Sequence, residues 1–110
     1  LHTNYPPYDI LKTDEHSSVI ELAVAGFSKK DIAVTVENGV LTVESDREGN
    51  AESSGQEIIH RGISKRYFKK SFSISDDVEI RGAELKDGLL RISMEKIIPE
   101  SRKRKEISIK

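Results

Sequence analysis

The residues that could carry out chemistry in this chain are few and scattered. Three histidines, His2, His16 and His60, lie far apart, without the short spacings that place several ligands around one metal ion. The chain has no cysteine, so disulfides and thiolate metal sites are excluded. It also lacks the motifs G-x-S-x-G, H-E-x-x-H and a glycine-rich phosphate loop followed by lysine. We therefore predict that the protein is not an enzyme and needs neither metal nor cofactor.

Four consecutive basic residues, Arg102 to Lys105, form the most concentrated charge in the sequence. Such a run could contact nucleic-acid phosphates. However, Glu100 and Glu106 flank it, no aromatic residue for base stacking lies nearby, and 18 basic residues of the chain are balanced by 19 acidic ones. We predict a solvated linker and no nucleic-acid partner. Since no apolar run approaches the roughly 20 residues that a helix needs to cross a bilayer, we expect no membrane span.

The last six residues, KEISIK, place Ile107 and Ile109 at alternate positions. In an extended segment these two side chains point to the same side. The spacing leaves two interpretations open. The isoleucines form a final strand of the chain's own sheet, or they fill alternate pockets of an apolar groove on another molecule.

Alternating apolar residues predict that the rest of the chain is all-β. Ile20, Leu22 and Val24 share one face of a strand, with Val19, Glu21 and Ala23 on the other. The same period of two recurs at Ile32, Val34 and Val36, at Leu41 and Val43, at Phe68, Phe72 and Ile74, and at Leu90, Ile92 and Met94. No stretch keeps the helical period over three turns, although FSKKD could form a short helical turn.

Turn residues between these runs predict hairpins. Asn38-Gly39 and Asp87-Gly88 tolerate the positive φ angles of tight turns. Several short strands joined by turns indicate a sandwich or a barrel, and the long polar loop favours a two-sheet sandwich. A length of 110 residues suits one domain.

Two segments interrupt the alternation. The first, Asp46 to Gln56, is acidic and rich in small residues, so we predict a mobile loop. The stretch EIIHRGI follows it, as a hairpin strand of its own subunit or as a strand that reaches a neighbouring subunit. Next, KRYFKK predicts a strand with a charged outer face, which could also pair with carboxylates across a dimer. The second segment is the charged tail after Pro99. We expect Pro99 to end the last strand, because a proline cannot donate to a strand ladder.

Four pieces of the sequence, in order, resemble the small heat shock proteins, the α-crystallin domain family. AELKDGLLRISM is similar to the family's A-x-x-x-n-G-v-L signature, ELAVAGFSKKDIAVTVENGVLTVESDR to the first half of its domain, RGISKRYFKKSF to the segment after its dimerisation loop, and Ile107-Ser108-Ile109 to its C-terminal I-x-I motif. The resemblance runs from about Tyr5 to Lys110 and is closest to the bacterial inclusion-body-binding branch.

The resemblance implies an antiparallel, immunoglobulin-like two-sheet sandwich over residues 8–98. A remnant of an N-terminal arm, longer in the family, would occupy residues 1–7, and a C-terminal extension residues 99–110. Within the domain, the loop 46–65 would carry a strand that is exchanged between the two subunits of a dimer. The residues implied in this exchange are Tyr8, Ile10, Ile58, Ile59, His60, Arg61 and Ile63.

The resemblance also implies that Ile107 and Ile109 dock in a groove between two edge strands and join dimers into larger homo-oligomers. The groove residues would be Ile32, Val34, Val36, Ala83 and Leu85. The implied activity is ATP-independent holding of unfolding client proteins during stress, in the cytoplasm. Two other interpretations are a co-chaperone sandwich module, which docks onto another chaperone, and a structural β-domain without client binding.

Overall fold

The computed structural model describes residues 5–45, 57, 59, 60, 67–98 and 103–110, and its strands confirm the all-β prediction. A short 3-10 helix, η1 (Lys29–Asp31), follows β2, where FSKKD was expected to form a helical turn. The strands are β1 (Tyr8–Lys12), β2 (Ser17–Ala23), β3 (Ile32–Glu37), β4 (Val40–Ser45), β5 (Lys69–Ser73), β6 (Val78–Lys86) and β7 (Leu89–Lys96).

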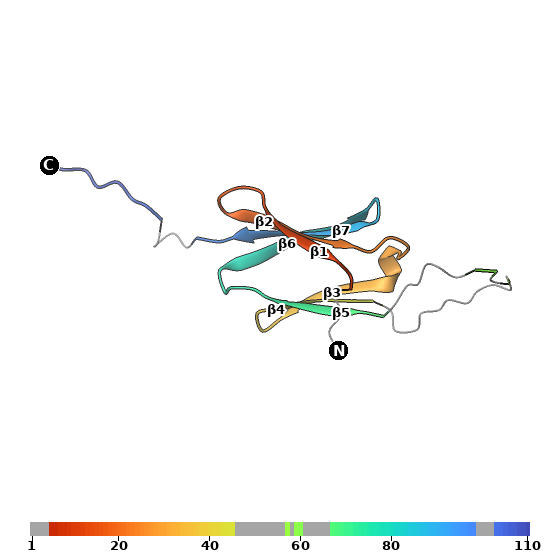
Figure 1. Cartoon of the computed structure of the whole chain (residues 1–110). Helices are drawn as coiled ribbons and strands as arrows, with labels where there is room; N and C mark the ends of the chain where they lie inside the picture. Colours follow the sequence, from red (N-terminus) through yellow and green to blue (C-terminus); the bar gives the residue numbers. More distant parts are fainter. Residues whose placement is uncertain (1–4, 46–56, 58, 61–66, 99–102) are drawn as a thin grey trace.

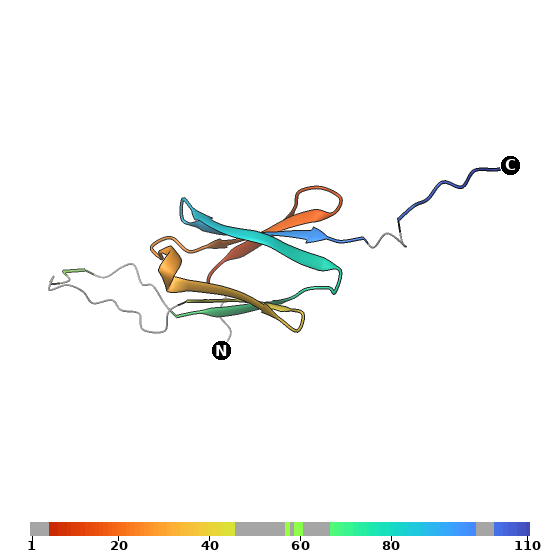
Figure 2. The same ribbon diagram turned by 180° about the vertical axis from the view of Figure 1, so that it is seen from behind.

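The strands form two antiparallel sheets that pack face to face, as predicted (Figure 1). One sheet has the order β1-β2-β7-β6 and the other β3-β4-β5, so β1, β6, β3 and β5 are edge strands. Figures 1 and 2, which view the molecule from opposite sides, show that β1 lies above β5 on one side and β6 lies above β3 on the other. The sandwich therefore has two open sides, which we call the β1–β5 edge and the β3–β6 edge.

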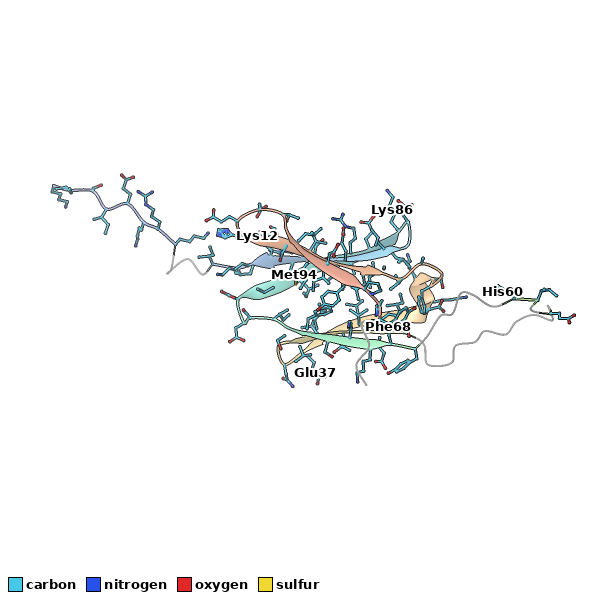
Figure 3. The ribbon with its side chains drawn as sticks, viewed as in Figure 1. Lys12, Glu37, His60, Phe68, Lys86 and Met94 are labelled. Carbon is cyan, nitrogen blue, oxygen red and sulfur yellow. The ribbon has the colours of Figure 1, made fainter. Side chains whose placement is uncertain are left out.

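The core lies between the sheets and consists of the alternating residues that the sequence singled out. Figure 3 shows Phe68 and Met94 between the two layers. The ring of Phe68 meets Tyr5 and Phe27 edge-on, with centroids 5.9 and 5.6 Å apart. The buried members of this cluster are Ile20, Leu22, Val24, Leu41, Val43, Phe68, Leu90, Ile92 and Met94.

The two predicted hairpin turns form as expected. Asn38 and Gly39 have φ angles of 52° and 76°, and Asp87 and Gly88 have 52° and 79°. Two consecutive positive φ values are typical of the turn whose twist matches the flanking strands. The first turn joins β3 to β4 and the second joins β6 to β7, so each edge strand of the β3–β6 edge is held in register by its own turn.

Two side chains differ from the simple alternation. Val19 lies on the outer face of β2, opposite to Ile20, yet it is buried beside its ladder partners Leu11 and Ser93. The predicted charged outer face of KRYFKK holds for Lys69 but not for Lys70. Lys70 shares the inward parity of Phe68 and is half-buried, with its Nζ 5.1 Å from the centroid of the Tyr8 ring.

Candidate functional site

The β3–β6 edge combines apolar side chains from two strands whose outer backbone is unpaired. On β3, Ile32 and Val34 face inward and are half-buried against the core, whereas Val36 is exposed. On β6, a bulge between Ile80 and Gly82 shifts the alternation by one residue. A bulge of this kind re-aims the side chains that follow it.

The bulge decides which residues of β6 face the core. Before the bulge, Ile80 pairs with the buried Met94, and after it Ala83 and Leu85 pair with the buried Ile92 and Leu90. All three therefore lie on the inner side of the sheet. The structure thus places the five predicted groove residues, Ile32, Val34, Val36, Ala83 and Leu85, on the two strands of one edge.

The described part of the tail, residues 103–110, contains no strand and is exposed throughout. Ile107 and Ile109 have 77% and 95% of their surface exposed, so neither side chain is buried by its own chain. Of the two interpretations of this tail, the final strand of its own sheet does not occur in the single chain. An exposed pair of branched aliphatic side chains remains available for another molecule.

The residues predicted for strand exchange are divided between β1 and the segment around Ile59. β1 pairs with β2 along one side, with Tyr8 opposite Leu22 and Ile10 opposite Ile20, and its other side is the border of the sheet. Ile59 and His60 are exposed and belong to no strand. Ile58, Arg61 and Ile63 lie outside the described residues.

A pocket of about 470 Å³, lined by apolar side chains and four serines, lies at the β1–β5 edge. Ile10 of β1, which is 57% exposed, and Phe72 of β5 border it. Tyr8 meets Phe72 edge-on at 5.1 Å between ring centroids, and Lys70 lies over Tyr8. The full lining comprises Ile10, Ser18, Ile20, Ser71, Phe72, Ser73, Ile74, Ser75, Val78 and Met94.

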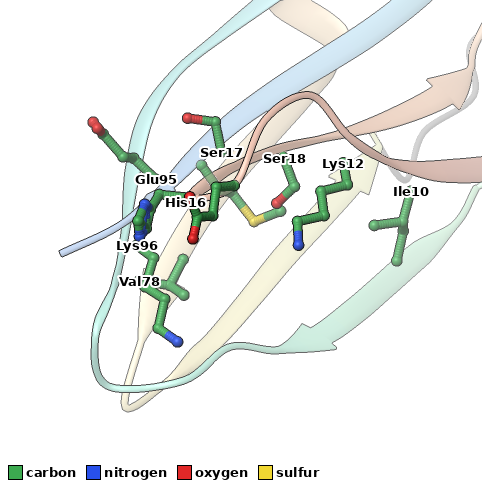
Figure 4. Close-up of a pocket in the computed structure, with 10 residues that line it drawn as sticks. Ile10, Lys12, His16, Ser17, Ser18, Val78, Glu95 and Lys96 are labelled. Carbon is green, nitrogen blue, oxygen red and sulfur yellow. The ribbon is translucent and has the colours of Figure 1, made fainter. Parts of the chain in front are cut away.

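A second pocket, of about 360 Å³, continues from the first toward the turn between β1 and β2. Figure 4 shows Ile10 and Lys12 projecting from β1 to the same side, toward this space. His16, which is half-buried, Glu15 and Lys96 also line it. In the described residues, no three or more side chains of His, Asp or Glu gather as a metal site would require.

Of the described histidines, His16 and His60 do not meet. His16 lies at the second pocket, Figure 3 shows His60 away from the two sheets, and His2 is outside the described residues. The backbone N–H of His16 donates to Asp14 Oδ1 at 2.9 Å, and this bond is the main cause that lowers the pKa of the Asp14 carboxyl from its ordinary 3.8. This arrangement stabilises the turn between β1 and β2.

Sequence reasoning missed Lys70, Phe72 and Ile74 as site residues because alternation alone does not show that their strand lies at an edge. The one available signal was a lysine at a position whose neighbours of the same parity, Phe68 and Phe72, are aromatic. A charged side chain with inward parity on an edge strand is one of the devices that discourage uncontrolled pairing.

Ion pairs lie on the outer face of the four-stranded sheet. Arg91 Nε is 2.8 Å from Glu21 Oε2, and Arg81 is 2.8 Å from both Glu79 and Glu95. Exposed pairs of this kind contribute about 0–1 kcal/mol each. They support solubility and register rather than a binding site. Within the part of the chain that is described, no helix is long and apolar enough to cross a membrane.

Comparison with known proteins gives a consistent match. Residues 10–110 match the family model described as Hsp20/alpha crystallin family. The small heat shock protein HspB of Bradyrhizobium diazoefficiens is 43% identical over 96% of this chain and 67% of its own length. The small heat shock protein IbpA of Serratia proteamaculans is 37% identical over 96% of this chain and 76% of its own length.

Solved structures agree with the sequence matches. A small heat shock protein from Synechococcus phage S-ShM2 superimposes with a TM-score of 0.73 and 41% identity, covering 96% of this chain and 99% of that one. A C-terminally truncated form of the small heat shock protein AgsA from Salmonella typhimurium gives a TM-score of 0.74 and 30% identity, covering 94% of this chain and 98% of that one. These likenesses confirm the predicted sandwich.

Proposed function

The chain belongs to the Hsp20/alpha crystallin family, and from this premise we propose that it is a holdase chaperone. Membership supports a chaperone role in general. Our finer proposal is that the protein binds unfolding proteins without ATP, performs no catalysis, and keeps its clients from aggregating. Its placement in the cytoplasm and its lack of a nucleic-acid partner stay predictions.

The observation that carries the proposal is that the chain has both an exposed apolar tail and an apolar β3–β6 edge. Ile107 and Ile109 are exposed, and the β3–β6 edge offers inward apolar side chains between two unpaired backbones. An extended segment can add to such a border through its backbone and fill alternate pockets with alternate side chains. We propose that the tail of one subunit docks in this way on the β3–β6 edge of another.

The energetics favour a contact that opens and closes. Fully burying two isoleucines contributes roughly 3–6 kcal/mol. Ordering the tail costs about 1–2 kcal/mol for each residue that is fixed, so the net contribution of one tail is small. Several tails in one assembly act together through their effective concentration. The result would be an oligomer that exchanges subunits.

Release of the tail exposes the surface that a client needs. An unfolding chain presents extended apolar segments, and the same side chains of Ile32, Val34 and Leu85 that would receive the tail can receive them. Tail and client therefore compete for the β3–β6 edge. This competition requires no nucleotide, because the energy comes from apolar burial and backbone pairing.

The second contact of the assembly is a dimer made by strand exchange. We propose that the segment Ile58 to Ile63 of one subunit pairs with the outer side of β1 in the other. The support is that β1 ends its sheet and so offers an unpaired row of backbone groups. Dimers would then join through their tails into larger homo-oligomers.

Two measurements test this function. In the first, a model enzyme is heated without ATP in the presence of the protein, and light scattering follows its aggregation. We expect scattering to be suppressed when the protein is present at an equimolar amount or above. Unchanged scattering would favour a structural β-domain without client binding.

The second measurement is the mass of the assembly in solution. Replacing both Ile107 and Ile109 with alanine removes the docking side chains, so we expect large assemblies to fall to dimers. Ser108→Ala is the matched control, because Ser108 lies between the two isoleucines and points to the other side. If the double variant keeps the size of the unaltered protein, the tail does not join the dimers.

A further inference from the structure

We propose that the C-terminal tail, residues 99–110, binds anionic lipid surfaces. Its basic residues would lie against the lipid headgroups, and Ile107 and Ile109 would enter the boundary between headgroups and acyl chains. The inference goes beyond the proposed function, because it gives the exposed tail a second kind of partner. It requires only a free tail and does not depend on the docking of that tail on another subunit.

The tail is the basic part of an otherwise acidic chain. It carries five basic residues, Arg102 to Lys105 and Lys110, and two acidic ones, Glu100 and Glu106, so its net charge is +3. The whole chain has a net charge of −1, so the rest of it is acidic. Clusters of roughly four to eight basic residues are attracted to anionic lipids, and each lysine or arginine near the surface contributes about fivefold in affinity.

The acidic domain does not cancel this attraction, because the tail holds the two apart. Figures 1 and 2 show the end of the chain extending away from the two sheets. Lys105 lies eight residues beyond Ile97, which follows β7. Eight extended residues span about 25 Å, whereas charges are screened over about 8 Å at physiological ionic strength. The basic run can therefore lie on a surface while the charges of the domain stay more than a screening length away.

The isoleucines distinguish a lipid surface from a nucleic acid as the partner of the basic run. Ile107 and Ile109 follow the run closely and are 77% and 95% exposed. Aliphatic side chains gain free energy by leaving water for the boundary of the acyl chains. A nucleic acid offers flat bases on which aromatic side chains stack, and the tail has no aromatic residue. The composition of the tail therefore fits an anionic lipid surface.

The number of free tails should set the strength of binding. One tail brings a small charge and two aliphatic side chains, so its contact is weak. Several tails on one assembly act together through their effective concentration. In the assembly proposed above, a docked tail hides its isoleucines, so released tails are the ones that insert.

Sedimentation with lipid vesicles tests the choice of surface. The protein is mixed with vesicles of phosphatidylcholine, with and without the anionic lipid phosphatidylglycerol. We expect the protein to sediment with the anionic vesicles and not with the neutral ones. Added salt should reduce the bound fraction, because it screens the attraction. The Ile107→Ala, Ile109→Ala variant should bind more weakly, since its tails neither insert nor hold several subunits together.

Charge variants in that same background test the basic run, because tails that no longer dock are equally available in every variant. Replacing both Arg104 and Lys105 with glutamine should lower the partition into anionic vesicles at least tenfold. Replacing both Lys29 and Lys30 with glutamine is the matched control. These two lysines are exposed on η1, so the control removes the same charge from the domain and should leave the partition unchanged.

A single fluorophore tests the insertion of the tail, because the chain has no tryptophan. With Ile109→Trp, we expect anionic vesicles with brominated acyl chains to quench the emission, since the side chain comes within reach of those chains. Ser73→Trp, at an exposed position of β5, is the control and should not be quenched. The emission before vesicles are added reports docking on another subunit, so the two events are read separately.

The outcomes decide each half of the proposal. Equal binding to neutral and anionic vesicles, or full binding by the Arg104 and Lys105 variant, would overturn the role of charge. Binding without quenching of the Ile109→Trp emission would overturn the insertion. Binding of single-stranded RNA but not of vesicles would assign the basic run to nucleic acid and overturn both. Suppression of aggregation and the mass of the assembly are measured without lipid, so the proposed function stands or falls independently.

Discussion

Ser45 is the last residue of β4, and its hydroxyl accepts a buried hydrogen bond from the backbone next to β5. Ser45 is 5% exposed and is the buried polar residue among those described. Its N–H donates to the Phe68 carbonyl oxygen at 3.0 Å, and its Oγ accepts from the Phe68 N–H at 2.9 Å. The two residues extend the β4–β5 ladder by one step beyond Glu44 and Lys69.

Ser45→Ala removes the acceptor and leaves the other partner in place. The N–H of Phe68 is then buried without a hydrogen bond, which costs about 1–3 kcal/mol of the free energy of unfolding. The backbone bond from Ser45 is unaffected, because alanine keeps its N–H. In a domain of this size, each kcal/mol lowers the melting temperature by roughly 4–8 °C. We therefore expect a loss of about 5 °C or more.

Urea denaturation followed by circular dichroism measures the effect, at two protein concentrations so that assembly is controlled. We expect a lower midpoint at an unchanged slope. Ser71→Ala, an exposed serine on the neighbouring strand β5, is the matched control and should change the free energy of unfolding by less than about 0.5 kcal/mol. If Ser45→Ala is no more costly than Ser71→Ala, the buried N–H has another partner and the reasoning fails.

Two further predictions concern single residues of the four-stranded sheet and its turns. Gly88 has φ +79°, and a Cβ there would lie 3.3 Å from the Cβ of Ala25, so Gly88→Ala should lower the free energy of unfolding by about 1–2 kcal/mol. Gly82→Ala, with no atom within 4 Å of the added Cβ, should be neutral or slightly stabilising, and urea denaturation of the two variants compares them. The hydrogen bond from the His16 N–H lowers the pKa of Asp14, so its stabilising contribution is present at neutral pH and is lost as the pH falls through that lowered pKa. Asp14→Asn should remove this part of the acid dependence, and an NMR titration of the Asp14 carboxyl that gave an ordinary or raised pKa would contradict it.

Alternation was sufficient to predict the core because the two faces of each strand differ so clearly in polarity. Leu41, Val43 and Ile92 are fully buried, and each sits in a run of period two. The turns could be predicted equally well, since Asn38-Gly39 and Asp87-Gly88 are among the few dipeptides that accept two positive φ angles. These local rules require no knowledge of which strands are neighbours.

Which strands lie next to each other could not be derived from local rules. The places where the structure differs from the predictions made from the sequence follow from that. Val19 is buried on the outer face because Leu11 of β1 lies beside it. Lys70 faces inward because it pairs with the buried Val43 of β4, and its Nζ lies over the ring of Tyr8. The side chains of β6 change parity at a bulge that the sequence marks with nothing but Gly82. The pocket at the β1–β5 edge depends on the stacking of two sheets and so appears in no single segment.

The four edge strands have a consequence that polymer chemistry describes well. Each of the four edge strands has unpaired backbone groups to which another chain could pair, so one subunit offers more than two positions for association. Such monomers form branched networks and gels, unless some of their reactive positions are capped. Lys69 and Lys70 cap β5, because bringing a second copy of that strand alongside would set like charges against each other. Lys69 and Lys70 therefore leave fewer borders of the subunit open to a second copy of the same strand.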